Sequence, residues 1–300
     1  MTATMAPKAA QRSILIVANP TSGGFRRRRL DRIAKALQER GHRIAVRLTE
    51  RAGELTEICA DPDLSADIVA VMGGDGSLNE AIAGLWQSGN RSVTLALIPA
   101  GTANVLALDL GLPRRTRALV DMLDRGRAED LNFGLANGKP FVLMVSVGVD
   151  AEIVHAVSLP LKRRFGKLAY AIATLRVLFR GSRHRVVVDT GAAQYRFGLA
   201  VITSASKYGG DFTLCPDASP RKPGLNLVGL PEDGWAARFR FGRGLATGRL
   251  CEMEGVISEP VEAARITAEP AAPCQVDGDP FGVTPIEVAS PDRPVSFVMP

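Results

Sequence analysis

The stretch "VMGGDGSLNEAIAGL", residues 71–85, runs from an apolar segment through three glycines into a helical pattern from about Leu78 to Trp86. Glycine-rich turns between a strand and a helix commonly bind phosphate, but this one matches neither of the two usual forms. It has no Lys after the glycines, and Asn79 stands where the dinucleotide-binding fingerprint requires its last glycine. The stretch predicts a strand–turn–helix unit whose central aspartate, Asp75, needs its own explanation.

Two other polar turns follow apolar segments in the same way. The turn "NPTSGG", residues 19–24, comes after "SILIVA", and "PAGTAN", residues 99–104, comes after "TLALI". Short apolar segments alternate with helical patterns up to about residue 130, which indicates an α/β domain with a mainly parallel, Rossmann-like sheet. Ligands of such sheets bind at the carboxyl ends of the strands, so we expect all three turns at one binding edge.

The pattern changes beyond residue 130. Strand-like segments separated by turns, such as "FVLMVSVGV" and "YRFGLAVITSAS", predict a β-sandwich-like second domain with one helical interruption, residues 166–181. The predicted organisation is a frayed N-terminus over residues 1–12, a nucleotide-binding α/β domain over 13–130 and a β-rich substrate domain over 131–300. The last strand can return to the first domain. The cleft between the two domains is the expected site.

The composition is that of a globular protein and narrows the function only slightly. Hydrophobic residues make up 46% and charged residues 23% of the chain, and the net charge of +6 suits anionic partners in general. The four cysteines form no C-x-x-C pair, so we expect reduced thiols and no zinc site. No apolar segment approaches the roughly 20 residues that a membrane-spanning helix needs. A cytoplasmic protein is therefore expected.

The glycines of the opening stretch suit a close approach of the backbone to a phosphate. Gly73, Gly74 and Gly76 can adopt positive φ angles and present their N–H groups. Ser77 can cap the following helix, whose N-terminus favours an anion. The alternative is a plain strand–helix turn in which Ser77 and Glu80 only form a capping box.

Asp75 is harder to explain as part of a plain turn. A carboxylate beside phosphates is unfavourable unless a cation lies between them, so Mg²⁺ is its natural partner. Phosphoryl transfer depends mostly on positioning and on charge neutralisation, which such an arrangement supplies. The loop therefore predicts a phosphoryl-transfer site in which Asp75 organises the metal.

The segments "NPTSGG", "GGDGSLNEAIAGL" and "IPAGTANVLALDLGLP", in this order and at these separations, resemble the diacylglycerol kinase catalytic domain. The resemblance continues through "VSVGVDAEIV", "YGGDFTLCPDAS" and "VDGDPFGVTPIEV", and it covers nearly all of the chain from residue 13 onward. The pattern is most similar to that of soluble bacterial lipid kinases, a group similar to sphingosine and ceramide kinases. The resemblance implies ATP-dependent phosphorylation of a lipid hydroxyl, with ATP and Mg²⁺ as cofactors.

The resemblance also implies which residues bind the nucleotide and which perform the chemistry. The positions that match the family's nucleotide contacts are Asn19, Thr49, Gly73, Gly74, Asp75, Gly76, Ser77, Leu78, Asn79, Gly101 and Thr102. The family's proton acceptor lies in a late D-G-E motif, which reads Asp277-Gly278-Asp279 here. Asp279 therefore takes the role of the base, assisted or replaced by Asp277. The alternative for this segment is a simple hairpin turn, since Asp-Gly is a leading turn dipeptide.

Several departures from the family pattern bear on activity. Val105 stands where the family often has Asp, which removes a carboxylate that could organise metal near Asp75. Ser77 replaces the commoner Thr and Asp279 the commoner Glu, and both keep the functional group. The segment "RKPGLNL", residues 221–227, lacks the acidic residues with which some bacterial members bind a structural Mg²⁺, so none is expected there.

A lipid substrate implies a protein that associates peripherally with a membrane surface, and nucleic acid is not an expected partner. Two basic segments could touch anionic lipid: residues 162–185, as an amphipathic helix, and "FRRRRLDR", residues 25–32. Either can instead be a solvated face, and Arg26–Arg29 could face nucleotide phosphates. The sequence is also compatible with a homodimer.

Two other functions stay open at this point. One is a kinase for a soluble acceptor such as NAD, because NAD kinases share the G-G-D-G loop. The other is a catalytically silent nucleotide- or lipid-binding regulator, which Val105 and the altered acidic residues favour.

Overall fold

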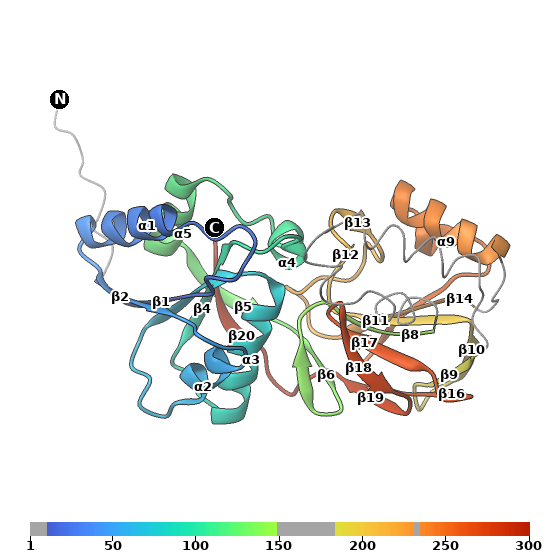
Figure 1. Cartoon of the computed structure of the whole chain (residues 1–300). Coiled ribbons are helices and arrows are strands. Elements are labelled where there is room, and N and C mark those ends of the chain that lie inside the picture. The colour runs from blue at the N-terminus through green and yellow to red at the C-terminus, as the bar shows by residue number, and fades with distance from the viewer. Residues whose placement is uncertain (1–10, 149–183, 231–234) are drawn as a thin grey trace. The chain divides into compact units, whose positions relative to one another are not determined.

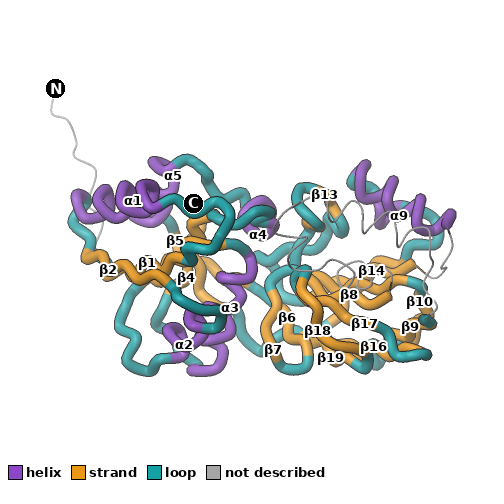
Figure 2. Tube along the Cα trace, in the orientation of Figure 1, coloured by secondary structure: helices purple, strands orange, loops and turns teal. Residues whose placement is uncertain are grey.

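The computed structural model describes residues 11–148, 184–230 and 235–300, without the side chains of 235–238 (Figure 1). The chain forms two compact units, the first ending at Asp130 and including Val295–Pro300, the second spanning Leu131–Pro294. The helices gather in the first unit and most strands in the second, as Figure 2 shows. The helix expected over residues 166–181 lies outside the described residues.

The first unit is built on a six-stranded sheet in the order β2-β1-β3-β4-β20-β5. Its strands are β1 (Ser13–Ala18), β2 (Arg43–Leu48), β3 (Ile68–Gly73), β4 (Thr94–Pro99), β5 (Arg127–Leu131) and β20 (Val295–Met299). Strands β1 to β4 run parallel, with Ile14 opposite Ile44 and Ile68. β20 is also parallel to β4, with Phe297 opposite Leu95. The predicted α/β fold with a mainly parallel sheet is confirmed.

Helices cover both faces of this sheet. They are α1 (Arg27–Glu39), α2 (Glu54–Ala60), α3 (Asp75–Ser88), α4 (Val105–Asp109) and α5 (Thr116–Arg125). α1 lies beside α5 on one face, and α2 lies beside α3 on the other (Figure 1). All six residues of β3 are buried between these layers. This double burial explains why a central parallel strand appears in the sequence as a continuous apolar run.

The second unit contains two six-stranded antiparallel sheets, in the orders β10-β9-β16-β19-β6-β7 and β15-β14-β11-β8-β17-β18, and a short ribbon β12-β13. The strands are β6 (Gly134–Ala136), β7 (Lys139–Phe141), β8 (Met144–Gly148), β9 (Arg185–Asp189), β10 (Gln194–Phe197), β11 (Leu199–Thr203), β12 (Lys207–Tyr208), β13 (Phe212–Thr213), β14 (Leu225–Leu230), β15 (Ile257–Val261), β16 (Ala263–Glu269), β17 (Pro273–Val276), β18 (Asp279–Val283) and β19 (Ile286–Ala289). The predicted sandwich-like class of this part is confirmed.

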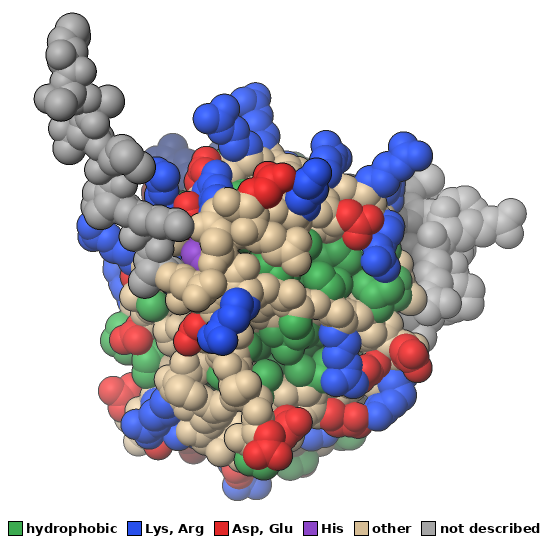
Figure 3. Space-filling view, turned by 90° about the vertical axis from the view of Figure 1, so that its left-hand side faces the viewer, with side chains coloured by type: hydrophobic (Ala, Val, Ile, Leu, Met, Phe, Trp, Pro, Cys, Tyr) green, Lys and Arg blue, Asp and Glu red, His purple; other side chains and the backbone are tan. Residues whose placement is uncertain are grey.

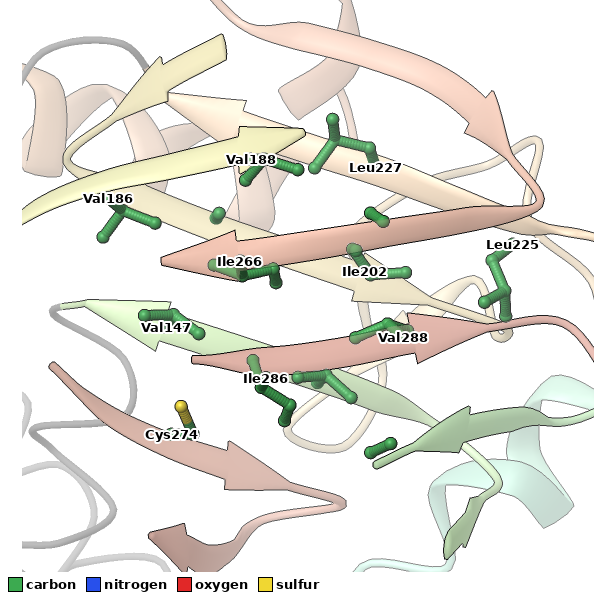
Figure 4. Close-up of a cluster of buried hydrophobic side chains, with 14 of the residues drawn as sticks. Val147, Val186, Val188, Ile202, Leu225, Leu227, Ile266, Cys274, Ile286 and Val288 are labelled. Carbon is green, nitrogen blue, oxygen red and sulfur yellow. The ribbon is translucent and has the colours of Figure 1, made fainter. Parts of the chain in front are cut away.

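A cluster of buried apolar side chains fills the space between these two sheets (Figure 4). Val188 of β9 and Ile266 of β16 come from one sheet, and Val147 of β8 and Ile202 of β11 come from the other. Along β9 the buried residues alternate with more exposed ones, as the two-residue period of a strand requires. Each sheet therefore buries one apolar face against the other, which is what stabilises a sandwich.

The second unit also contains a helix that the sequence patterns do not predict, α9 (Trp235–Thr247), followed by the short helix η1 (Leu250–Glu252). The letters "RFRF" within α9 alternate polar and apolar residues as a strand does, and two glycines follow, so the helical period is hidden. Tertiary packing decides instead, because the rings of Phe241 and Tyr208 meet edge-on with centroids 6.2 Å apart.

Within the ranges that the structure describes, no helix is both long and apolar enough to cross a membrane.

Candidate active site

Three polar turns lie at one edge of the first unit's sheet. They are the first turn (residues 19–24), the second turn (73–77) and the third turn (99–104), which follow β1, β3 and β4. Because these strands are parallel neighbours, their carboxyl ends point to the same edge. Thr49, directly after β2, lies at this edge too, and its N–H donates to Ala18 O at 3.0 Å.

Backbone hydrogen bonds hold the three turns against one another. Asn19 N–H donates to Met72 O at 3.0 Å, which ties the first turn to the end of β3. Gly24 N–H donates to Ala100 O at 2.8 Å, and Ala100 N–H donates to Gly73 O at 2.8 Å, so the third turn contacts both others. The turns therefore form one continuous surface.

The glycines of the second turn allow close packing and do not take unusual backbone angles. None of Gly73, Gly74 and Gly76 has a positive φ angle, so that expectation from the sequence is wrong. A Cβ on Gly73 would lie 2.5 Å from the Ser77 side chain, and one on Gly101 would lie 2.6 Å from Gly74 Cα. The second and third turns approach this closely because neither of the facing glycines has a side chain.

Helix α3 begins at Asp75, inside the glycine motif and three residues earlier than expected. Gly74 occupies the capping position in an extended conformation and has no side chain, so the cap predicted for Ser77 is wrong. The first N–H groups of a helix have no acceptor within the helix and attract anions. Gly76 is exposed in this first turn, and a Cβ on it would meet nothing within 4 Å. The start of α3 is therefore open to a ligand.

Asp75 joins the second turn to the third. Its Oδ2 accepts the Val105 N–H and its Oδ1 accepts the Leu106 N–H, each at 3.0 Å, which caps the start of α4. Burial raises the pKa of the Asp75 carboxyl, and the two backbone hydrogen bonds partly offset that rise. Each carboxylate oxygen has a second lone pair, so Asp75 can keep this contact and also bind a cation.

Two neighbours shape the third turn in ways that the sequence patterns do not reveal. Asn104 has a left-handed backbone with φ 51°, and its side chain bonds Gly101 twice at 2.8 Å, accepting from the N–H and donating to the carbonyl. Asn tolerates this conformation better than most residues, which is the signal that could have identified it. Val105, where the resemblance implies an Asp, is buried in the core.

The other residues predicted to contact the nucleotide differ in exposure and in the polar groups that they present. Asn19 Nδ2 donates to Ser77 Oγ at 3.4 Å, which links the first two turns. Thr102 is exposed on the third turn, whereas Leu78 is fully buried and can offer only its backbone. Asn79 Oδ1 is buried and accepts no hydrogen bond from any residue that the structure describes. It is thus a polar atom that a ligand or water can satisfy.

The arginines near the start of α1 are largely used within the protein. The Arg29 guanidinium donates to Pro99 O at 3.0 Å and to Arg114 O at 2.8 Å, which braces the third turn, and burial lowers its pKa. Arg27 pairs with Asp31 at 2.9 Å. On the side of the molecule where α1 and β2 lie, basic and acidic side chains are interspersed (Figure 3). Sequence reasoning missed the bracing role of Arg29.

In the second unit, Asp277 and Gly278 form the two-residue turn between β17 and β18. Their φ angles are 51° and 82°, and positive values at both central residues define a type I′ hairpin turn. Val276 and Asp279 are partners across the hairpin. The turn interpretation of this segment is correct for its local structure, and it is compatible with a chemical role for Asp279.

Asp277 fixes this hairpin to the segment that leads into β8. Its Oδ2 accepts the Val142 N–H at 2.8 Å, and its Oδ1 accepts the N–H groups of Leu143 at 2.8 Å and Met144 at 3.0 Å. Its own N–H donates to Met144 O at 2.9 Å. Because three backbone donors occupy this carboxylate, the arrangement favours Asp279 over Asp277 as a proton acceptor.

Gln275 supports the same turn from inside the sheet, and sequence reasoning missed it. Only 2% of the residue is exposed; its Oε1 accepts the Gly278 N–H at 2.7 Å and its Nε2 donates to Ser146 Oγ at 2.9 Å. A polar residue in an otherwise apolar strand was the available signal. Asp279 follows as the exposed first residue of β18.

The chain thus combines a parallel α/β unit that carries clustered polar turns with a second unit of antiparallel sheets. Residues 13–136 match the family model of the diacylglycerol kinase catalytic domain. Residues 143–297 match that of the YegS C-terminal NAD kinase beta sandwich-like domain. The chain belongs to the diacylglycerol kinase family, whose kinases use ATP.

Relatives match over almost the whole chain. A diacylglycerol kinase of Bacillus subtilis (strain 168) is 27% identical over 290 residues, 95% of each chain. A diacylglycerol kinase of Staphylococcus aureus (strain Newman) is 25% identical over 95% of this chain and 91% of its own.

Solved structures share the fold. A crystal structure of a diacylglycerol kinase from Bacillus anthracis str. Sterne has a TM-score of 0.72 at 16% identity and covers 96% of this chain and 97% of its own. A second structure from that organism reaches 0.82 at 20% identity, with coverage of 100% and 98%.

Proposed function

We propose that this chain is an ATP-dependent lipid kinase that transfers the γ-phosphoryl group of ATP to the hydroxyl of a diacylglycerol-like or sphingoid- or ceramide-like lipid. The observation that carries the proposal is the convergence of the three turns on the open start of α3, where Gly76 leaves room for a phosphate. The relatives that are named diacylglycerol kinase support this class of acceptor.

The phosphate chain of ATP would bind across the three turns. The N–H groups at the start of α3 are the natural donors to it, because the partial positive charge of the helix end reinforces each hydrogen bond. The exposed Thr102 would add a hydroxyl from the third turn, and Asn19 would contribute from the first. Thr49 lies at the same edge and would contact the nucleotide from the end of β2.

The residues present fit a magnesium ion that arrives with the nucleotide. Asp75 offers a carboxylate beside the open turn, and Asn79 Oδ1, one helical turn further along, lacks a partner among the described residues. No three His, Cys, Asp or Glu side chains gather as a metal site in the described parts of the chain, so Asp75 needs phosphate oxygens as co-ligands. The ion would supply charge neutralisation on the phosphates.

Asp279 would take the proton of the lipid hydroxyl. As that proton moves to the carboxylate, the hydroxyl oxygen bonds to the γ-phosphorus and the bond from phosphorus to the leaving ADP oxygen breaks. Asp277 and Gln275 would act as positioning residues, because their hydrogen bonds fix the backbone on which Asp279 follows. The lipid acceptor also implies that the enzyme works as a peripheral protein at a membrane surface.

The test is phosphate transfer from γ-labelled ATP with Mg²⁺ to separate acceptors: diacylglycerol, sphingosine, ceramide, phosphatidylglycerol and NAD. We expect label in a lipid, and a loss of roughly 10²- to 10⁴-fold in kcat for Asp279→Asn. Asp189→Asn changes an exposed carboxylate in the same unit and is the matched control. Equal rates for Asp279→Asn and wild type would show that the base is another group.

The same assay separates the alternative functions. Label in NAD but in no lipid would identify a kinase with a soluble acceptor. A thermal shift on ATP binding without transfer to any acceptor would identify a silent regulator.

A further inference from the structure

Two of the four cysteines lie beside each other in the second unit. Cys215 comes two residues after β13, and Cys251 is the middle residue of η1. Cys251 Sγ lies 3.3 Å from Leu214 O, beside the peptide group that leads into Cys215. The Cys251 thiol also hydrogen-bonds the Cys215 sulfur. All four cysteines are reduced, so this contact joins two free thiols.

Backbone contacts fix the segment that carries Cys215. The N–H groups of Leu214 and Cys215 both donate to Ser206 O, at 2.8 and 3.4 Å. A Cβ on Gly248 would lie 3.7 Å from the Thr213 side chain, so the chain just before η1 also touches this segment. The two thiols are therefore held beside each other by the packing of both segments.

A hydroxyl group contacts both sulfurs. Ser258 Oγ of β15 lies 3.8 Å from Cys215 Sγ, and Ser258 also hydrogen-bonds the Cys251 side chain. A hydroxyl can turn its proton toward whichever sulfur carries the negative charge. The surroundings of the pair can thus stabilise a thiolate on either sulfur.

The pair differs in acidity from the other two cysteines. Burial raises the pKa of Cys59 to about 12 and the pKa of Cys274 to about 11. At Cys215 the hydrogen bond from Cys251 outweighs burial and lowers the pKa to about 6, and the same hydrogen bond raises the pKa of Cys251. At neutral pH the pair therefore shares one proton, whereas the two isolated thiols stay protonated.

Cys251 is also the cysteine that solvent reaches. It is partly exposed, whereas Cys59, Cys215 and Cys274 are buried. A small oxidant therefore meets Cys251 first and finds Cys215 in contact with it. An accessible thiol with a second, acidic thiol beside it is the arrangement of redox-active cysteine pairs.

We propose that Cys215 and Cys251 form an oxidation site that hydrogen peroxide closes into a reversible disulfide. In the first step the Cys251 sulfur bonds to one peroxide oxygen, its proton passes to Cys215, and the O–O bond breaks to release hydroxide. Cys251 is then a sulfenic acid. In the second step the Cys215 sulfur bonds to the Cys251 sulfur, the S–O bond breaks, and the Cys215 proton leaves with the hydroxyl as water. The two sulfurs together lose two electrons, which reduce the peroxide.

The disulfide would tie the segment after β13 to η1 and so close a loop that contains β14 and α9. A crosslink restricts the unfolded chain more than the folded one when the folded geometry already suits it. Oxidation should therefore stabilise the second unit. Dithiothreitol should reverse this effect by thiol–disulfide exchange.

The first test is a peptide map of the wild type. The protein is treated with a small molar excess of hydrogen peroxide, unfolded with N-ethylmaleimide and digested with trypsin without reductant. The four cysteines fall in four different peptides, because arginines lie between them. We expect the Cys215 and Cys251 peptides to be joined, lighter than their sum by two hydrogen atoms, and separated by dithiothreitol. Cys59 and Cys274 should carry the maleimide. No joined peptides, another pairing, or a band of twice the mass on a non-reducing gel would overturn the proposal.

Substitutions test the role of each sulfur. Cys215→Ser leaves Cys251 without a thiol to resolve its sulfenic acid, so peroxide should carry Cys251 on to sulfinic acid, which dithiothreitol does not reverse. Cys251→Ser should show no oxidation of Cys215. Cys274→Ser changes a buried thiol elsewhere in the same unit and should form the link as wild type does. Oxidation of Cys215 to the same extent in Cys251→Ser would overturn the assigned order of steps, and the wild-type map needs no variant to fold.

Thermal unfolding gives a second measure. The Tm of oxidised wild type should rise by about 5 °C and return to the reduced value with dithiothreitol, while Cys251→Ser should show no rise. An unchanged or lowered Tm in protein that carries the link would show that the bond forms only after local opening, and would overturn the preformed pair. Neither measurement needs ATP or lipid, so both are independent of the proposed function.

Discussion

In the first unit Asp75 accepts the N–H groups of Val105 and Leu106, and in the second unit Asp277 accepts those of three successive residues, 142–144. Both carboxylates connect a turn to a segment that is distant in the sequence. The glycines around Asp75 have ordinary φ angles. Among them, Gly74 lies against the backbone of Gly101 and Gly73 lies against the Ser77 side chain, whereas the surroundings of Gly76 are open. In the second unit, a Cβ on Gly278 would meet nothing within 4 Å, and both Asp277 and Gly278 have positive φ angles.

This difference shows that a glycine beside an aspartate can reflect either of two constraints, a close contact or a particular backbone conformation. In G-G-D-G, Gly74 reflects steric contact between two turns, whereas in D-G-D the glycine reflects a hairpin conformation. Substitutions that alter only the contact or only the conformation therefore test independently how the Asp75 turn and the Asp277 turn are held.

The largest effect is expected from Asp277→Ala. Val142, Leu143 and Met144 are buried, and the substitution leaves their N–H groups without an acceptor, at a cost of about 4 kcal/mol in unfolding free energy. Urea denaturation at neutral pH measures this. Asp277→Asn retains one acceptor oxygen and should lose less, and the exposed neighbour Asp279→Ala should lose least. Similar stabilities for Asp277→Ala and Asp279→Ala would show that the hydrogen bonds of the Asp277 carboxylate do not stabilise the fold.

Gly101→Ala should be the next most damaging change. Its Cβ would lie 2.6 Å from Gly74 Cα, a backbone atom that cannot swing aside, so we expect a loss of about 2 kcal/mol. The measurement is the same denaturation series. If Gly101→Ala unfolds at the wild-type urea concentration, the close contact between the second and third turns is not essential.

Gly76→Ala tests whether the open start of α3 binds phosphate. Its Cβ meets nothing in the protein and alanine is the better helix former, so stability should stay the same or rise by up to about 1 kcal/mol. The methyl group would occupy the proposed phosphate position, so the Kd for Mg–ATP should rise about tenfold, which corresponds to about 1.4 kcal/mol. Calorimetric titration of both proteins with Mg–ATP decides the matter. An unchanged Kd for Mg–ATP would show that the phosphates bind at another position.

Gly278→Ala isolates backbone conformation from contact. Its φ of 82° disfavours a side chain, but a Cβ would meet nothing within 4 Å, so we expect a loss of about 1 kcal/mol. Gly111→Ala, with φ 67° and the same open surroundings, should lose a similar amount. A loss at Gly278 well above that at Gly111 would reveal a further constraint on the hairpin. Thermal unfolding of both variants provides the comparison.

The smallest effect concerns the pH dependence at Asp75. Because burial raises the pKa of this carboxyl in the folded state, folding favours its protonated form. Its contribution to stability is full below the ordinary Asp pKa of about 4 and is lost as pH rises through the raised value. The stability advantage of wild type over Asp75→Asn should therefore shrink as the pH increases. An advantage that grows with pH would contradict the assigned direction.

Much of the first unit is predictable because β1, β3 and β4 are short apolar runs, each followed by a polar turn. The edge strand β5, which reads "RAEDL", has no such pattern. The three turns meet at one edge because the carboxyl ends of parallel neighbouring strands point the same way. The start of α3 at Asp75 was missed because glycine is a poor helix former, so Gly76 did not suggest a helix. Packing overrides this low helix propensity in the folded protein.

The long-range hydrogen bonds of Asp75 and Asp277 could not be predicted from the sequence. Asp75 meets Val105 thirty residues later, and Asp277 meets Val142 more than a hundred residues earlier, so no local pattern links them. For α9, the alternation of Arg238 to Phe241 imitates a strand, and only its contact with Tyr208 reveals the helix. Long-range contacts determine these parts of the molecule.

The position of β20 has a consequence for how the protein is made. β20 lies between β4 and β5, yet a ribosome produces Val295–Met299 only after the whole of the second unit. Until then β4 and β5 each have an unpaired edge, and such edges invite association with other chains. The turn that follows β4 belongs to the edge that we propose binds the nucleotide. The half of the enzyme that is synthesised first is therefore the half that is completed last.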